Sequence, residues 1–369
     1  MKKIMKVVIL IILIFSAIFP AMLYLNPNFG SNPSNYQKAG FANFKNYDNG
    51  KFQNLEKFEM MTGEISIFEF FKKDTSRKPK KELKQEPIQI QEFCKTGSKR
   101  LKFSWLGHSA FILNINNKII LLDPMFGKYA SPIPIPSLKR YSSGIPFSID
   151  ELTSIDAVIF SHDHYDHLDY STIKQIKNKV KKFYVPHGLG NHLKRWGVND
   201  HKIHELNWNQ AIKHDDIEFV CLPALHFSGR GPFNRNSTLW ASWAIKSPYG
   251  NVYFGGDSGY GKHFVDIGQQ HGPFNFSFLD CGQYNGSWKY SHMVPEESVQ
   301  ASIDLNSNYF IPIHWAGFTL ALHSWTEPVE RSLKHAEKLN QKILTPKLGQ
   351  IVTLHNEMND YNSNWWRGI

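Results

Sequence analysis

The sequence predicts a layered α/β fold in which helices cover sheets of largely buried strands. Two observations support this prediction. Short apolar runs of strand length recur between residues 101 and 313 and alternate with stretches of helical pattern. Several of these runs end at a His or Asp that begins a polar loop, which is typical of strands that deliver side chains to one edge of a sheet.

The composition allows a large folded core. The chain has 369 residues, of which 41% are hydrophobic and 14% aromatic, so it is not a disordered protein. The formal net charge is +10, but residues 1–102 already hold 18 Lys and Arg against 9 Asp and Glu. A basic nucleic-acid surface is therefore not expected on the main domain. The three cysteines, Cys94, Cys221 and Cys281, are too scattered for a disulfide framework or a thiolate metal site.

The first 25 residues predict a membrane segment. Residues 7–25 carry no charge and approach the roughly 20 apolar residues that a helix needs to cross a bilayer. Lys2, Lys3 and Lys6 precede this stretch, so the positive-inside rule places the following domain on the non-cytoplasmic side. An uncleaved signal anchor is favoured over a cleaved signal peptide, because no cleavage site of small residues follows the apolar stretch.

The remaining chain divides into three parts. Residues 26–100 are mixed and broken by Asn, Gly and Pro, so they predict a tether with docking segments. The Lys-rich run at 72–81 is expected to be solvated or, secondarily, to meet anionic lipid headgroups. An apolar cluster is expected to pack on the main domain or lie in a membrane interface; it consists of Ile65, Ile67, Phe68, Phe70 and Phe71. Residues 101–355 form the main domain, and residues 356–369 form a C-terminal tail.

Strands and helices alternate through the main domain. Strands are expected at residues 101–106, 110–115, 118–122, 157–160, 182–185, 217–222, 242–247, 252–254, 276–279 and 310–313. Helices are expected at residues 148–152, 171–178, 295–305 and 327–339. Asn116 and Asn117 predict a tight turn between the second and third strands. This order favours layered sheets with helices outside them.

A cluster of metal-binding residue types follows the strand at 157–160. Residues 162–167 read His-Asp-His-Tyr-Asp-His and contain three imidazoles and two carboxylates, of which Asp166 is the candidate ligand. Imidazole nitrogen and carboxylate oxygen are ligands that zinc prefers. We expect His162 and His164 at one metal, and Asp166 and His167 at another. An ordinary His-rich surface loop is the alternative, and the apolar strand directly before the cluster disfavours it.

Further candidate ligands follow three later strands. His226 comes after the strand at 217–222, Asp257 after the strand at 252–254, and His314 after the strand at 310–313. Each residue alone has an ordinary explanation as a capping or hydrogen-bonded core side chain. Together with the first cluster they give five His and two Asp, a set that suits two metal ions sharing one carboxylate.

The complete pattern resembles the metallo-β-lactamase superfamily, whose fold is an αββα sandwich with a dinuclear metal site. Within it, the chain resembles the N-acylphosphatidylethanolamine-hydrolysing phospholipase D (NAPE-PLD) family. Seven motifs in order carry this resemblance: Trp105–Ala110, Leu122–Phe126, Ser161–Asp169, Pro223–Phe227, Asn236–Trp240, Gly255–Tyr260 and Ile313–Trp315. The resemblance implies that residues 101–355 are a metallo-hydrolase domain.

The resemblance also implies two zinc ions per chain. The ligands would be His162, His164 and His226 for one ion, Asp166, His167 and His314 for the other, and Asp257 as the bridge. Tyr165 and His292 would contact the substrate and act with Asp257 in catalysis. Asp123 and His108 are candidates to orient the ligating side chains, although a buried structural role explains them equally well.

The expected activity is zinc-dependent phosphodiester hydrolysis of phospholipase D type. It would convert N-acylphosphatidylethanolamine to an N-acylethanolamine and phosphatidic acid. Hydrolysis of another ester, a lactone or a different phosphodiester is a first alternative, because one such site serves many substrates across the superfamily. A membrane-anchored binding protein without catalysis is a second. The expected partners are a phospholipid substrate and a membrane; a homodimer stays open, and no nucleic acid is expected.

Overall fold

The computed structural model describes residues 5, 20, 23–59, 61–64, 69, 72, 74–95, 100–355 and 358–369. Most of the predicted membrane segment at 7–25 lies outside these residues, and so does the whole apolar cluster of residues 65, 67, 68, 70 and 71. Within the described ranges, no helix has both the length and the apolar character that crossing a bilayer requires.

Two sheets form the centre of the described part of the chain. The strands of the first sheet are β3 (Leu101–Trp105), β4 (Phe111–Ile115), β5 (Lys118–Leu122), β6 (Ile155–Ile159), β7 (Val180–Pro186), β8 (Ile203–Leu206) and β15 (Ile351–Thr353). Those of the second are β9 (Ala211–His214), β10 (Ile217–Leu222), β11 (Ser242–Lys246), β12 (Val252–Phe254), β13 (Phe274–Asp280) and β14 (Ser307–Ile313). Their orders are β15-β3-β4-β5-β6-β7-β8 and β14-β13-β12-β11-β10-β9. A short hairpin, β1 (Tyr47–Asp48) and β2 (Lys51–Phe52), precedes them.

The parallel parts of the two sheets place the candidate site. Strands β5 to β8 run parallel in the first sheet, and β12 to β14 run parallel in the second. The carboxyl ends of parallel neighbours lie at the same edge of a sheet. The loops that follow β5, β6, β12, β13 and β14 therefore begin at two such edges.

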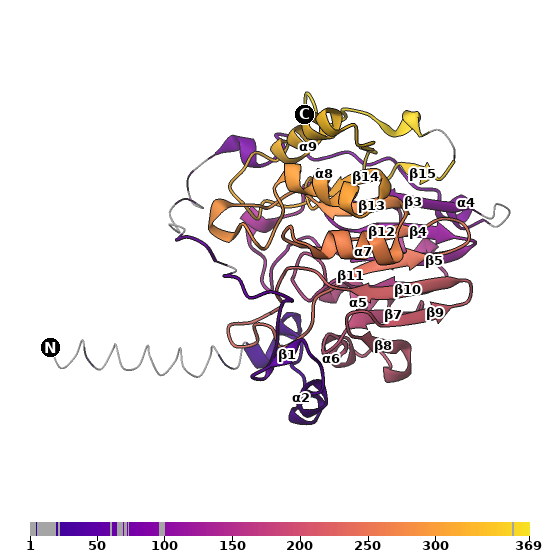
Figure 1. The fold of residues 1–369 in the computed structure, drawn as a ribbon. Helices are drawn as coiled ribbons and strands as arrows, with labels where there is room; N and C mark the ends of the chain where they lie inside the picture. Colours follow the sequence, from indigo (N-terminus) through magenta and orange to yellow (C-terminus); the bar gives the residue numbers. More distant parts are fainter. Residues whose placement is uncertain are drawn as a thin grey trace.

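Helices cover the outer face of each sheet (Figure 1). Helices α4 (Ile90–Cys94), α5 (Tyr170–Ile176) and α6 (Gly190–Arg195) share a buried cluster with the first sheet. Helices α7 (His263–His271), α8 (Pro295–Asp304) and α9 (Glu327–Leu339) share another with the second. The helix α2 (Asn35–Phe41) lies near the N-terminus. Short 3-10 turns occur at Pro27–Phe29, Thr75–Arg77, Pro136–Leu138, Ile149–Glu151, Asp200–Lys202, Gly286–Trp288 and Asn359–Tyr361.

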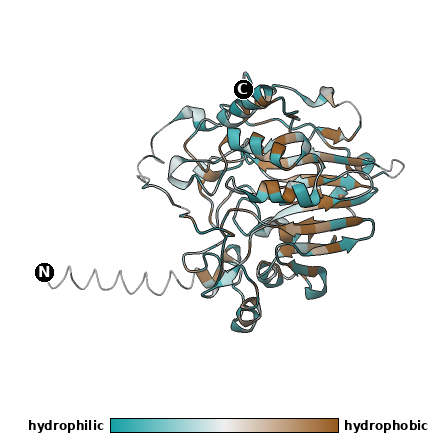
Figure 2. Ribbon diagram, in the orientation of Figure 1, coloured by the Kyte–Doolittle hydropathy of each residue, from teal (hydrophilic) through white to brown (hydrophobic). Residues whose placement is uncertain are grey.

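The main core lies between the two sheets. Side chains alternate along β4, so Phe111 and Leu113 face the second sheet while Ile112 faces the helices. The ring of Phe111 stacks on Phe278 of β13 with a centroid distance of 4.1 Å and an interplanar angle of 6°. Hydrophobic residues accordingly concentrate on the strands (Figure 2). These layers confirm the predicted αββα sandwich.

All ten expected strands are present, with ends that differ by a few residues. Three of the expected helices are also present, whereas residues 148–152 form only the 3-10 turn Ile149–Glu151. The sequence prediction missed β1, β2, α2 and α4 before residue 101, and β8, β9, β15, α6 and α7 after it. Each of these elements is short or is interrupted by polar residues.

The flanking parts of the chain contribute to the core. Phe41 and Phe52 from the N-terminal part and Trp366 from the C-terminal part join the cluster between the sheets, and Trp366 is 1% exposed. Leu83 belongs to the same cluster. The proposed division of the chain at residues 100 and 355 stays a prediction.

Candidate metal centre

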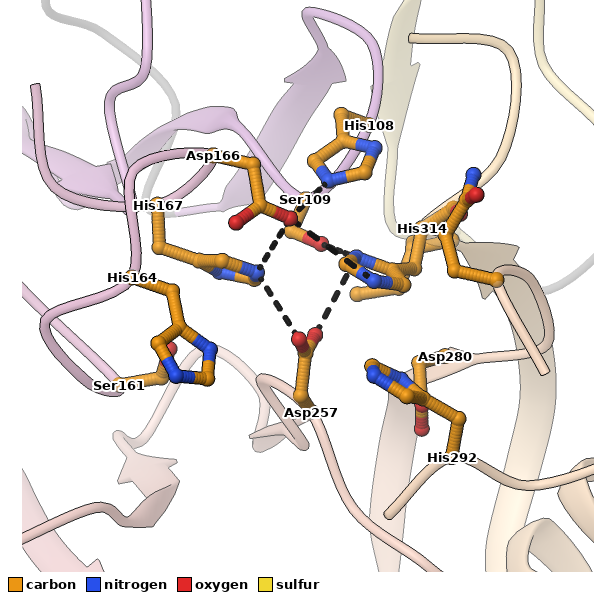
Figure 3. A network of polar contacts seen from close by, with 12 residues as sticks. His108, Ser109, Ser161, His164, Asp166, His167, Asp257, Asp280, His292 and His314 are labelled. Atoms are coloured by element: carbon orange, nitrogen blue, oxygen red, sulfur yellow. Dashed lines mark hydrogen bonds and ion pairs between the residues drawn. The ribbon is translucent and has the colours of Figure 1, made fainter. Parts of the chain in front are cut away.

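Four loops bring the seven predicted ligands together. Figure 3 shows His164, Asp166, His167, Asp257 and His314 among them. The segment 162–167 follows β6, and the three remaining ligands, His226, Asp257 and His314, follow β10, β12 and β14. Most of these side chains are buried, and Asp257 itself is 3% exposed. The carboxyl ends of β12 and β14 lie at one edge of the second sheet, and the segment after β6 reaches the same centre from the first sheet.

Three histidines, His162, His164 and His226, form what we call the imidazole group. Nε2 of His162 lies 2.8 Å from Nδ1 of His164, and Nε2 of His226 lies 3.2 Å from the same atom. Four-coordinate zinc with nitrogen ligands at about 2.0–2.1 Å places those nitrogens roughly 3.3 Å apart. The spacing within this group is therefore close to that of ligands around one ion.

Asp166, His167 and His314 form what we call the mixed group. Oδ2 of Asp166 lies 3.4 Å from Nε2 of His167 and 3.9 Å from Nε2 of His314. His108 completes a set of four with them, because its Nε2 lies 2.8 Å from Oδ2 of Asp166. This group thus combines imidazole with carboxylate and has an additional imidazole beside it.

Asp257 lies between the two groups. Its Oδ2 is 3.7 Å from Nε2 of both His162 and His226, and 3.1 Å from Nε2 of His167. Its Oδ1 is 3.2 Å from Nδ1 of His314. One carboxylate therefore approaches imidazoles of both groups, as a bridging ligand must.

Outer partners fix the orientation of several ligands. Asp123 accepts a hydrogen bond of 2.6 Å from Nδ1 of His167, and the Ser291 carbonyl accepts one of 2.9 Å from Nδ1 of His226. Each bond places a proton on Nδ1, so Nε2 is the nitrogen that faces the centre and could bind a metal ion. Asp123 and His108 each contact a predicted ligand directly, as a residue that orients a ligating side chain does.

Burial sets the protonation of the centre. It lowers the pKa values of His162, His226 and His314 well below their usual range, so these imidazoles are neutral at pH 7. Burial raises the pKa of Asp257 to about 6, against the lowering effect of His167. Neutral imidazole is the form that binds a metal ion.

The centre fits the metal ions that the sequence implies. Nε2 of His167 and Oδ1 of Asp257 are buried and make no hydrogen bond of good geometry, although each lies within ion-pair distance of another member of the centre. Buried polar atoms without a hydrogen bond are costly, and an ion between the two groups would supply a partner for both. The nitrogen and oxygen donors suit a borderline divalent ion such as zinc.

The backbone at the centre is tightly constrained. His108, Asp123 and His314 have φ values of 54°, 36° and 65°, in the left-handed region that costs energy for residues other than glycine. Gly256 has a φ of 57°, and a Cβ there would lie 2.4 Å from Cβ of Ser161. Glycine thus lets the loop of Asp257 approach the loop that carries the histidine cluster.

The two predicted substrate contacts occupy different surroundings. The His292 ring lies 5.1 Å from the rings of both His226 and His314, and its side chain is 13% exposed. The Tyr165 hydroxyl instead donates to the Arg230 carbonyl, and its ring lies 4.1 Å from the Arg230 guanidinium. His292 is therefore next to both groups, and the role of Tyr165 in substrate contact stays a prediction.

Sequence reasoning missed several residues that support the centre. Asp280 lies 3.2 Å from Nδ1 of His292 and directly follows the expected strand at 276–279, so the rule of strand ends could have found it. Asn54 accepts a hydrogen bond from the His226 backbone, and Arg230 donates to the carbonyls of Asp163 and Leu168 at the two ends of the histidine cluster. No local sequence pattern marks Asn54 or Arg230.

Comparison with known proteins agrees with this geometry. The β-lactamase superfamily domain matches residues 118–315. An uncharacterised protein of Mycobacterium tuberculosis is 39% identical over 331 residues, which cover 87% of each chain. N-acyl-phosphatidylethanolamine-hydrolyzing phospholipase D 1 of Caenorhabditis elegans is 32% identical over 229 residues, which cover 59% of this chain and 64% of that protein.

Solved structures share the fold. The isothiocyanate hydrolase from Delia radicum gut bacteria superposes with a TM-score of 0.56 at 19% identity, over 70% of this chain and 99% of the other. The domain match covers more than half of the present chain and includes the strand ends that carry the ligands. The chain therefore belongs to the metallo-β-lactamase superfamily and is one of its metal-dependent hydrolases.

Proposed function

We propose that the protein is a zinc-dependent phospholipase D that hydrolyses N-acylphosphatidylethanolamine to an N-acylethanolamine and phosphatidic acid. The position of Asp257 between two groups of ligands is the observation that carries the proposal. Paired ions at such a site suit an in-line displacement at phosphorus. The similarity to the worm phospholipase D motivates the choice of lipid.

The bound ions would supply two kinds of chemistry: they would lower the pKa of a water to about 7 and offset charge on the phosphoryl oxygens. The chain's own residues would hold this arrangement in place. Asp257 fixes the spacing of the two groups, and Asp123 fixes the ring of His167 through its Nδ1. The buried surroundings exclude bulk water and strengthen these electrostatic contacts.

His292 would act on the substrate beside the ions. Its Nδ1 faces Oδ2 of Asp280 at 3.2 Å, which leaves Nε2 available to hold or receive a proton. Burial lowers the pKa of His292, so the ring is neutral at pH 7 and Nε2 can act as an acceptor. Asp280 thereby serves as a positioning residue for His292.

The membrane part of the proposal rests on the N-terminal sequence. An apolar segment at residues 7–25 would hold the enzyme at a bilayer, with the catalytic domain on the non-cytoplasmic side. Such a tether raises the effective concentration of lipid substrate at the active site. A phospholipid and the membrane are the partners that this arrangement requires.

Mass spectrometry of lipids tests the proposal. Metal-replete wild-type protein, Asp257→Asn and the surface control Asp266→Asn are each incubated with a total membrane extract. We expect wild type and the control to deplete N-acylphosphatidylethanolamine and form both products, and Asp257→Asn to leave the lipid intact. Hydrolysis of a small ester or lactone by wild type, with this phospholipid unchanged, would favour the alternative hydrolase function.

A further inference from the structure

A basic groove lies beside the metal centre and plays no part in the proposed reaction. It has a volume of about 260 Å³ and runs between the segment 78–82 and the loop 136–141. Its charged lining comprises Lys78, Lys80, Lys81, Lys139, Arg140 and Glu82. The lining therefore contains five cationic side chains and one carboxylate.

The four lysines of the groove are exposed, and no ion pair joins them to a carboxylate of the described residues. Hydrogen bonds hold the backbone beneath them, because Tyr141 and Thr319 both donate to the Arg77 carbonyl and Leu83 donates to the Tyr141 carbonyl. The positive charges of the run therefore sit on a backbone that is fixed to the domain.

Arg140 distinguishes this groove from an ordinary lysine-rich surface. Its side chain is buried, with a residue exposure of 5%, and donates to the carbonyls of Gly127 and Met125. No described carboxylate forms an ion pair with it. Burial lowers the pKa of Arg140 to about 10, with only a weaker opposing effect of Asp169. A buried cation without a counter-ion is costly, and an anion in the groove would offset that cost.

The groove is separated from the metal centre by one aromatic ring. The Arg140 guanidinium lies 5.0 Å from the centroid of the Phe318 ring, and that ring packs against His108 at 5.2 Å. His108 in turn bonds Asp166 of the mixed group. An anion in the groove would thus be bound next to the centre without contacting its ligands.

We propose that this groove binds a phosphate group, supplied by an anionic phospholipid headgroup or by a free phosphate anion. Nε and Nη2 of Arg140 already bond the Gly127 and Met125 carbonyls, so Nη1 is the nitrogen that would donate to a phosphate oxygen, and the lysines would add point charges around it. The volume exceeds that of inorganic phosphate and leaves room for the rest of a headgroup. The lysine run that the sequence marks as basic is then one wall of a defined site.

Vesicle binding by the full chain tests the site. Binding to phosphatidylcholine vesicles with and without phosphatidic acid is compared for wild type and for Lys80→Glu with Lys81→Glu. The double variant should lose the preference for phosphatidic acid by roughly tenfold or more, because each charge near an anionic surface adds substantially to affinity. Lys213→Glu with Lys338→Glu is the matched control, since both lysines are exposed and lie outside the groove.

Two further arms separate the sources of the phosphate and the two sites. Calorimetry with inorganic phosphate alone identifies a free anion as ligand if wild type binds it and the groove variant does not. Vesicle preference without binding of inorganic phosphate identifies the lipid headgroup. Asp257→Asn should keep the vesicle preference, because the groove does not use the metal centre. The proposal is overturned if the groove variant retains the wild-type preference, or if the control pair loses as much.

Discussion

The two ligand groups are built differently. The imidazole group consists of three neutral rings whose nitrogens face one another at 2.8 and 3.2 Å. The mixed group contains the Asp166 carboxylate, and buried partners already bond its members: His108 bonds Asp166, and Asp123 bonds His167. The mixed group therefore has carboxylates bonded to its members, whereas the partners of the imidazole group are uncharged, such as the Ser291 carbonyl and the Ser161 hydroxyl.

This difference predicts how each half of the centre behaves when metal is removed. Without an ion, the three neutral rings can hold one another only through N–H···N hydrogen bonds between ring nitrogens, whereas the mixed group has hydrogen bonds to carboxylates. The hydrogen bonds of the mixed group remain in place without an ion. Asp257 couples the halves because it lies near both.

Metal removal should have the largest effect. Chelation is expected to abolish hydrolysis and to lower thermal stability, because ions that bind only the folded state stabilise it, by about 2.7 kcal/mol at a concentration of 100 Kd. Hydrogen exchange should increase more in the loop of His226 than in the loop of His314. Added zinc should restore activity and protection. Equal loss of protection in both loops would contradict the difference between the imidazole group and the mixed group.

Asp123→Asn should have an intermediate effect. The variant weakens the acceptor for Nδ1 of His167, and loss of such an outer partner typically costs roughly 10–100-fold in metal affinity or activity. Competition with a chelating dye should show the loss mainly for one of two ions. Asp156→Asn, another buried carboxylate that accepts hydrogen bonds away from the centre, is the control. An equal loss at both ions would contradict the distinction between the groups.

His263 sharpens the comparison because it is a buried histidine outside both groups. Burial lowers its pKa to about 3, and its Nε2 lies 3.3 Å from Oγ of Ser258. The unfolded chain binds a proton at this ring below pH 6.5 and the folded chain does not, so stability falls as the pH drops from 6.5 toward 3. We expect this effect on stability to be smaller than the effects of metal removal and of Asp123→Asn.

Urea unfolding at pH 7.5 and pH 5.5 measures this contribution. His263→Gln should remove about 1.4 kcal/mol of the stability that wild type loses between pH 7.5 and 5.5, because the lower pH lies one unit below the pKa of the unfolded ring. Identical losses in wild type and variant would show that the ring is not kept neutral by burial.

Much of the centre could be predicted from sequence because its ligands follow apolar strands. This local pattern marks His226, Asp257 and His314 as clearly as the histidine cluster itself. It also extends to Asp280, which ends β13. Each ligand lies within a few residues of the strand that precedes it, so both can be predicted without knowledge of the tertiary structure.

The supporting contacts could not be predicted in the same way. Asn54 reaches the His226 backbone from a segment without helical or strand period, 172 positions away. Arg230 holds the histidine cluster through backbone carbonyls, which any sequence supplies. The polar edge strands β8 and β9 likewise lack an apolar pattern and form by pairing with their neighbours. Such features depend on long-range packing.

Native mass spectrometry of the zinc-loaded full chain tests the central claim most directly. Two ligand groups sharing Asp257 predict two ions in wild type, and one ion in each of His164→Ala and His314→Ala. His263→Gln should keep both ions and serves as the control. A wild-type protein with one ion, or single variants that both retain two, would contradict the account of a dinuclear centre.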